Sequence, residues 1–206
     1  MMTPVRQTTP KRRNITKAVS HWTKHKADLK LDFNSYCAYC GSYDGYRHTY
    51  YEVDHFVPKS FFEPLGNISL TQYDNLVYSC KFCNNHKKHK WPSQSEIIYH
   101  NGTEGFIDPC SEEYDDHLFR TADGAIMWRT TLGKWMHNVA FKFDERERGL
   151  QLLWNLNRLR LIIKKLTLIK VKFEVDDPIY LEIDNRLKSY SQTYVQYDIE
   201  LIEYYS

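Results

Sequence analysis

The sequence predicts an α+β protein with a zinc-stapled strand–turn–helix core in its centre and a mostly helical C-terminal part. Three observations predict this fold. Two cysteine pairs stand far apart in the chain, strand-like sequence lies between them, and apolar residues recur at helical spacing beyond residue 146. The 206 residues include 42% hydrophobic and 15% aromatic side chains, an ordinary globular composition that excludes disorder along the whole chain.

The N-terminal segment, residues 1–30, carries eight Lys or Arg against one acidic residue. Prolines interrupt any regular element before residue 11, so we expect a basic arm that is either flexible on DNA or disordered. A short helix is expected over 21–32. The arm lacks the apolar core of a secretory signal, and no apolar run approaches the roughly 18 residues that cross a bilayer. We therefore expect a cytoplasmic protein with no membrane segment.

Four cysteines form two tight pairs, Cys37 with Cys40 and Cys80 with Cys83, separated by 39 residues. This spacing is typical of a tetrahedral structural zinc site. Iron–sulfur ligation and simple buried thiols are the alternatives, whereas a disulfide is disfavoured in a reducing cytoplasm. The fifth cysteine, Cys110, is expected to be a buried or idle thiol.

The chemistry is predicted to lie between the two cysteine pairs. A strand within 50–60 ends at Asp54 and His55 before a proline, and a second strand over 73–79 runs into the second pair. Asn84 follows that pair as the expected start of a helix. Zinc at both ends of such a segment would bring Asp54, His55 and Asn84 together. Without the four cysteines, a packed histidine beside a turn-forming aspartate would be the better interpretation.

An ordered set of segments resembles the HNH endonuclease family in its zinc-knuckle ββα-metal form, over about residues 36–92. These segments are Val-Asp-His-Phe-Val-Pro, Asn-Leu and Cys-Lys-Phe-Cys-Asn-Asn-His-Lys. The resemblance implies that Asp54 and Asn84 hold a catalytic divalent ion, that His55 is the general base, and that Asn75 braces the loop. Because neither metal position is histidine, Mg²⁺ or Mn²⁺ is expected at the catalytic ion site. His86 or His89 could replace Asn84, although neither clearly shares its helix face.

Charge and aromatic patterning suggest a nucleic-acid contact surface. The segment after the second cysteine pair is lysine-rich, and we expect phosphate contacts there, with solvated surface lysines as the alternative. Tyrosines between residues 36 and 51 are expected in the core rather than stacked on bases. The lysines predicted to contact nucleic acid are Lys81, Lys87, Lys88 and Lys90.

Four regions are predicted: the arm at 1–30, the nuclease core at 31–95, a mixed strand and loop extension at 96–145, and a helical hairpin at 146–206. In the extension we expect strands over 103–106 and 117–127, with a turn at 123–124. The hairpin is expected to pair a helix over 146–170 with a helix over 180–203. Pro178 is expected to end the element that contains the first helix. Core packing is its favoured role, with docking of another protein as the alternative.

The layout downstream of the motif is similar to small HNH proteins of bacterial anti-phage systems, of the Septu and retron-associated types. That resemblance implies a DNA-cleaving effector for antiviral defence, with an ATPase partner binding the C-terminal helices. Two alternatives stay open, a non-catalytic zinc module that only binds nucleic acid and a free-standing restriction-like nuclease.

Overall fold

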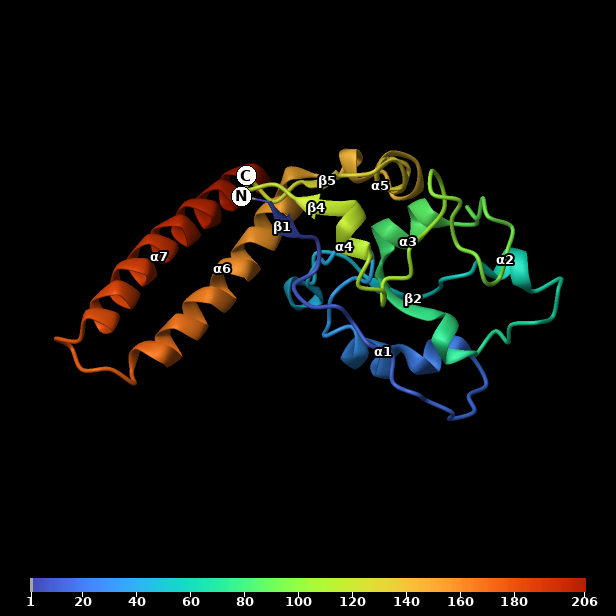
Figure 1. Ribbon diagram of the computed structural model, residues 1–206, viewed down its shortest axis with the longest axis horizontal. Helices are drawn as coiled ribbons and strands as arrows, with labels where there is room; N and C mark the ends of the chain where they lie inside the picture. Colours follow the sequence, from blue (N-terminus) through green and yellow to red (C-terminus); the bar gives the residue numbers. More distant parts are fainter. Residues whose placement is uncertain (1) are drawn as a thin grey trace. The chain divides into compact units, whose positions relative to one another are not determined.

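The computed structural model describes residues 2–206 and has the predicted α+β class (Figure 1). The chain folds as two compact units, the first ending at Arg146 and the second spanning Glu147–Ser206. This division falls next to the predicted start of the helical hairpin, whereas the three regions predicted before it form one unit. None of the described helices combines the length and apolar character needed to span a membrane.

The centre of the first unit is a two-stranded antiparallel ribbon followed directly by a helix. Strand β2 (Tyr51–His55) pairs with β3 (Leu76–Cys80), and helix α3 (Lys81–Lys87) starts at the residue after β3. All five residues of β3 are buried, as expected for a strand covered on both faces. The prediction of a ββα core is therefore confirmed.

A second layer packs on the ribbon. The turn η1 (Trp22–His25) runs into helix α1 (Lys26–Asp32), and these elements contact β2 and β3. They match the helix predicted over 21–32. Three short elements complete the loops between the cysteine pairs: η2 (Asp44–Tyr46), α2 (Lys59–Phe62) and η3 (Tyr73–Asn75).

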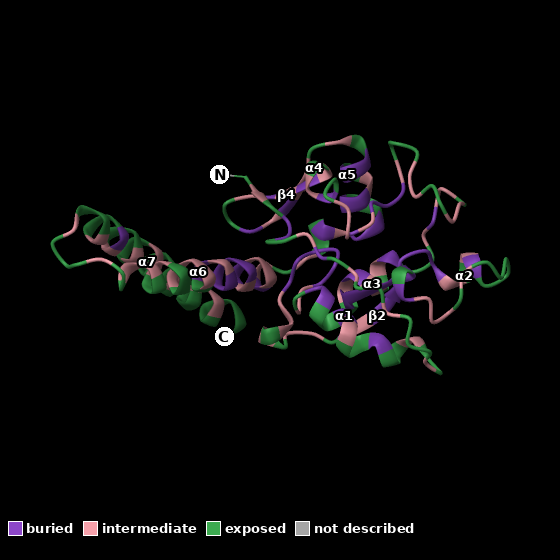
Figure 2. Ribbon diagram, turned by 60° about the horizontal axis from the view of Figure 1, so that its bottom comes forward, coloured by how far each residue is buried: buried purple, intermediate pink, exposed green. Residues whose placement is uncertain are grey.

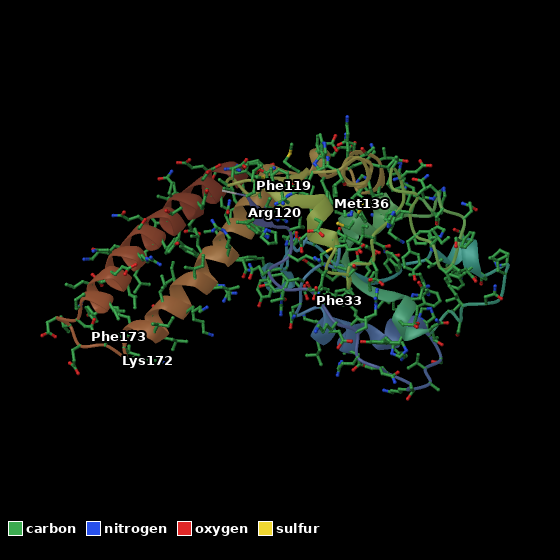
Figure 3. All side chains as sticks on the ribbon, in the orientation of Figure 1. Phe33, Phe119, Arg120, Met136, Lys172 and Phe173 are labelled. Carbon is green, nitrogen blue, oxygen red and sulfur yellow. The ribbon has the colours of Figure 1, made fainter. Side chains whose placement is uncertain are left out.

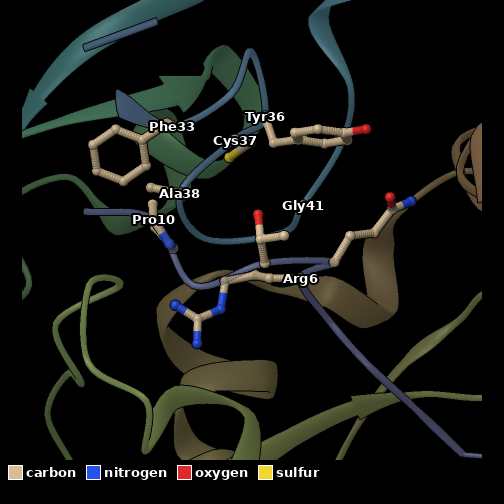
Figure 4. Close-up of a pocket in the computed structure, with 9 residues that line it drawn as sticks. Arg6, Pro10, Phe33, Tyr36, Cys37, Ala38 and Gly41 are labelled. Atoms are coloured by element: carbon tan, nitrogen blue, oxygen red, sulfur yellow. The ribbon is translucent and has the colours of Figure 1, made fainter. Parts of the chain in front are cut away.

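The N-terminal segment differs from the expected free arm because Arg6 and Arg12 are bound inside the unit. Strand β1 (Thr3–Pro4) pairs with a later strand, and the Arg6 guanidinium forms an ion pair of 2.9 Å with Asp115. Arg12 donates to both oxygens of Asp108 and to the carbonyl of Leu76. Figure 4 shows Arg6 and Pro10 beside the turn that carries Cys37.

The extension after α3 contains a β-hairpin that lies between two short helices in the sequence. Helix α4 (Tyr114–His117) precedes β4 (Leu118–Arg120), which pairs with β5 (Ile126–Trp128) around the predicted Asp-Gly turn. Helix α5 (Thr131–Trp135), the π-helical η4 (Met136–Ala140) and η5 (Phe143–Glu145) follow. The strand expected over 103–106 does not form, since its backbone makes only an isolated bridge between His100 and Gly105.

The second unit is the predicted helical hairpin, made of α6 (Arg148–Lys170) and α7 (Pro178–Tyr205). Lys172 and Phe173 lie in the connection at its tip (Figure 3). Pro178 begins α7 rather than ending α6, because proline is well suited to the first helical turn, where its missing N–H costs nothing. Within α7 only Ile183 is buried, so most of its surface is exposed or half-buried (Figure 2).

Candidate metal centre and catalytic site

The four predicted zinc ligands converge on one point. The sulfurs of Cys37, Cys40, Cys80 and Cys83 all lie within 4.8 Å of one another, and all four residues are buried. The Cys40 and Cys80 sulfurs are 3.8 Å apart. A tetrahedral ion with Zn–S bonds of about 2.3 Å separates its sulfurs by roughly 3.8 Å, so the donor set fits structural zinc.

Local backbone geometry explains why these cysteines meet. Cys80 is the last residue of β3 and Cys83 lies in the first turn of α3. The other pair lies on a turn closed by Gly41, whose φ of +65° favours glycine. A side chain there would also lie 2.5 Å from the carbonyl oxygen of Val5, so the N-terminal segment packs directly over this turn.

Hydrogen-bond donors surround the sulfurs. The backbone N–H of Cys80 donates to the Cys37 sulfur at 3.3 Å, and the Arg146 guanidinium lies 3.8 Å from the sulfurs of both Cys80 and Cys83. Such donors stabilise thiolates, which are the form that binds a metal. Cys110 stands apart, and burial raises the pKa of its thiol to about 11, as expected for an idle cysteine.

Asp54 is held tightly at the end of β2. Its Oδ2 accepts a hydrogen bond of 2.6 Å from the buried Tyr39 hydroxyl and lies 3.2 Å from the Lys87 ammonium. Both partners bind the same oxygen, so the carboxylate is oriented and its second oxygen is the one left to meet an ion.

Lys87 does not fit the predicted phosphate contact. Its side chain has no exposed area, and its ammonium bridges Asp54 and the backbone carbonyl of His55, which lies 2.8 Å away. Burial lowers the pKa of Lys87, while the charge of Asp54 acts in the opposite direction. Lys90 is also turned inward, since it donates to the carbonyls of His86 and Ala140. Of the four predicted lysines, only Lys81 and Lys88 are exposed.

His55 has a defined tautomer. Its Nε2 lies 2.9 Å from the carbonyl oxygen of Leu70, which can only accept, so Nε2 carries the proton and Nδ1 keeps the lone pair. Burial lowers the pKa of His55 below its usual 6.5, although the Leu70 carbonyl and the Asp54 charge offset part of this shift. The ring is therefore neutral at pH 7, and it packs against Trp22 and Phe62.

Asn75 makes the backbone contacts that a bracing residue requires. Its Oδ1 accepts from the N–H of Val57 at 2.8 Å, and its Nδ2 donates to the carbonyl of the same residue at 3.1 Å. Its own carbonyl accepts from the N–H of Phe56. The two residues after His55 are thus tied to the start of β3, which limits movement of the histidine.

Asn84 lies in the fourth position of α3, not at the helix start as predicted, because the helix begins directly after Cys80. Its Nδ2 donates a 2.7 Å hydrogen bond to the carboxylate of Glu52. A carboxylate accepts only, so this bond fixes which end of the amide faces Glu52 and directs Oδ1 elsewhere.

Glu52 is a residue that sequence reasoning missed. It precedes Asp54 by two positions in β2, and alternate residues of a strand share a face. Asn84 and Lys87, three positions apart on α3, contact Glu52 and Asp54 respectively. The period-two pattern of the predicted strand was the signal that could have identified it.

The strand alternation places Asp54 and Asn84 on one side of the ribbon and the His55 ring on the other, so the three side chains are not brought together as predicted. Asp54 points to the face covered by α3, whereas His55 points to the face where Trp22 of η1 lies. The Lys87 ammonium touches both residues, through the Asp54 carboxylate and the His55 carbonyl. His86 packs against Phe82 at a tilted angle and His89 is exposed beyond α3, so neither histidine replaces Asn84 beside Glu52.

Comparison with known proteins finds a family match in the same segment. Residues 37–90 match the family model of the HNH endonuclease. The match begins at the first cysteine of the zinc site and includes both strands and all of α3. No curated protein and no solved structure matches the chain. The family match supports a nuclease or nucleic-acid-related function.

Proposed function

From the HNH endonuclease domain at residues 37–90, we propose that the protein is a divalent-metal-dependent endonuclease that hydrolyses phosphodiester bonds of DNA. The observation that carries the proposal is His55, held as a neutral base at the end of β2 and adjacent in sequence to Asp54, whose oriented carboxylate points to the other face of the strand. Hydrolysis at neutral pH requires a group that accepts a proton from water, and the Nδ1 lone pair of His55 supplies it.

The residues facing α3 are proposed to hold the ion. Asp54 offers the oxygen that Tyr39 and Lys87 leave free, and Asn84 offers Oδ1, a neutral oxygen of the kind that Mg²⁺ and Mn²⁺ accept. A divalent ion bound there supplies a positive charge that stabilises the leaving oxygen. Glu52 orients the Asn84 amide, and the Lys87 ammonium keeps Asp54 in place.

Plasmid nicking with Mg²⁺ or Mn²⁺ tests the base. His55→Ala is expected to lower the nicking rate by about 10²- to 10⁴-fold, because the proton acceptor is lost. His89→Ala, an exposed histidine beyond α3, is the matched control and should nick at the wild-type rate. Equal rates for the wild-type protein and His55→Ala would contradict the assignment, and a wild-type protein that never nicks would favour the non-catalytic zinc module.

Mn²⁺ titration followed by electron paramagnetic resonance tests the ion site without any cleavage. Glu52→Gln removes the acceptor that fixes the Asn84 amide and is expected to weaken Mn²⁺ binding by about 10-fold. Glu63→Gln, a half-exposed carboxylate beside Lys59, is the control. Unchanged Mn²⁺ affinity in Glu52→Gln would show that Asn84 does not need this partner.

From the sequence resemblance described above, we propose that the protein acts in anti-phage defence together with an ATPase partner. The exposed apolar side chains of α7 are the surface on which the partner would bind. Co-purification of an ATPase from infected cells, lost when α7 is deleted, would support this role. Retention of the ATPase after the deletion would contradict the assigned surface.

A further inference from the structure

A cationic groove lies on the face of the ββα core opposite α3. Its volume is about 810 Å³, and it runs between the η1–α1 segment and the loop of residues 44–50. Tyr51 of β2 and Tyr78 of β3 also line it. This groove is separate from the lysine-rich helix to which the sequence assigned nucleic-acid contacts.

The groove carries an excess of positive charge. Four cationic side chains line it, and Asp44 is the one acidic lining residue. Asp44 already pairs with Lys30 at 2.5 Å and accepts from the Tyr78 hydroxyl at 2.7 Å. Lys24, Lys26 and Arg47 are exposed and form no ion pair among residues 2–206. The cationic set comprises Lys24, Lys26, Lys30 and Arg47.

A further feature indicates a ligand with bases as well as phosphates. Tyr50 stands at the groove with 78% of its surface exposed, which is unusual for a large aromatic side chain. A polyanion whose bases can stack on an aromatic ring would cover this side chain.

The groove leads toward His55. Tyr51 and His55 lie on the same face of β2, four residues apart, which corresponds to about 13 Å along a strand. From the other side, Trp22 packs against the His55 ring at 5.1 Å between ring centroids, and Lys24 follows it in the same turn, η1. A strand lying in the groove would thus pass the proposed base.

We propose that this groove binds the phosphate backbone of a nucleic acid strand, with Lys24, Lys26 and Arg47 contacting phosphates and Tyr50 stacking on a base. The inference rests on the proposed nuclease function, since it assigns the substrate track of the same site. It places the phosphate contacts on the η1–α1 side of the ribbon rather than on Lys81 and Lys88. The strand would meet the ion proposed at Asp54 and Asn84 only where it passes the end of β2.

Fluorescence anisotropy with labelled 20-nucleotide single-stranded and 20-base-pair duplex DNA tests the track, at several salt concentrations and without added divalent ion. Lys24→Glu/Lys26→Glu is expected to raise Kd at least about 10-fold. It should also reduce the slope of log K against log salt by about two, because each phosphate contact contributes roughly 0.7 to 0.9. Lys81→Glu/Lys88→Glu makes the same charge change on α3 and should stay within about twofold of the wild-type protein.

Equal losses in the two double variants, or a larger loss in the α3 variant, would overturn the proposal. Tyr50→Ala should weaken single-strand binding more than duplex binding, and an equal or absent effect would overturn the stacking role. Zinc content and circular dichroism check that every variant is folded. Wild-type affinity in Lys24→Glu/Lys26→Glu, together with loss of nicking in His55→Ala, would reject the groove and keep the nuclease. No DNA binding or nicking by the wild-type protein would reject both.

Discussion

The metal-binding ββα segment and the C-terminal hairpin stabilise their helices in different ways. Helix α3 has 7 residues, too few for an isolated helix in water, and it depends on Cys80 and Cys83 at its start and on Lys87 at its end. Helices α6 and α7 have 23 and 28 residues and rely on their own backbone hydrogen bonds and on each other. The short helix at the site therefore depends more on tertiary contacts than the two long helices do.

The two regions also differ in how they use charge. In the ββα segment, buried charges such as Lys87 and Asp54 meet inside the unit and orient neighbouring groups. In the hairpin, α6 contains no acidic residue whereas α7 contains five, and Lys170 pairs with Asp184 across the two helices. Ion pairs at the protein surface contribute little each, so the hairpin tolerates changes that the site does not.

The largest expected effect comes from breaking the metal site. Cys80→Ser should unfold the ββα segment, because zinc binding and folding are one equilibrium with apparent binding free energies of about 10–16 kcal/mol in small zinc domains. Zinc content and limited proteolysis measure the loss. Cys110→Ser, which changes a half-buried thiol outside the site, should keep its zinc. A Cys80→Ser protein with wild-type zinc content and melting temperature would contradict the zinc site.

The hairpin provides the next comparison, with one substitution at two positions of α7. Ile183→Ala should destabilise the hairpin by about 2–3 kcal/mol, because Ile183 is the buried residue of α7. Ile199→Ala should cost less than about 0.5 kcal/mol, since Ile199 is 45% exposed. Thermal unfolding followed by circular dichroism separates the two variants, and equal losses would show that another contact covers Ile199.

A polar change in the ββα segment is expected to cost nearly as much as the apolar one in the hairpin. Asn75→Ala leaves the buried N–H of Val57 without its acceptor, which costs about 1–3 kcal/mol. Asn85→Ala, on the exposed side of α3, is the control. Urea unfolding measures both variants. If Asn75→Ala lowers the free energy of unfolding no more than the control does, the loop does not depend on the hydrogen bonds of Asn75.

The smallest expected effect is a pH dependence of the hairpin. Hydrogen bonds from Lys170 and Lys188 lower the pKa of Asp184 to about 2 from its usual 3.8. The folded pKa is the lower one, so this stabilisation is fully present above about pH 4 and is lost as the pH falls through 2. Asp184→Asn should therefore show a smaller drop in melting temperature between pH 5 and pH 2. The melting temperature of the control, Asp198→Asn, should fall over the same pH range by as much as that of the wild-type protein.

Most element positions were predictable because they depend on local sequence. Periodicity and turn residues predict the helix over 21–32 and the C-terminal helices. They also predict the strand that ends at the Asp-His pair and the strand that leads into the second cysteine pair. The roles of single side chains were less predictable. Lys87 is indistinguishable from its neighbour Lys88 in sequence, yet one is buried against Asp54 and the other is exposed.

The paired spacing of four cysteines was enough by itself to predict a zinc-held core, because metal ligands must be particular residue types at particular separations. The nuclease prediction came from the resemblance of the Asp-His and Cys-Asn-Asn-His-Lys segments to the HNH endonuclease family. Only the tertiary structure decided that Glu52 faces Asn84, that Tyr39 and Lys87 hold one oxygen of Asp54, and that Arg6 and Arg12 are bound inside the unit. These contacts join residues distant in the chain, and their geometry depends on how strands, helices and loops pack, which no local pattern encodes.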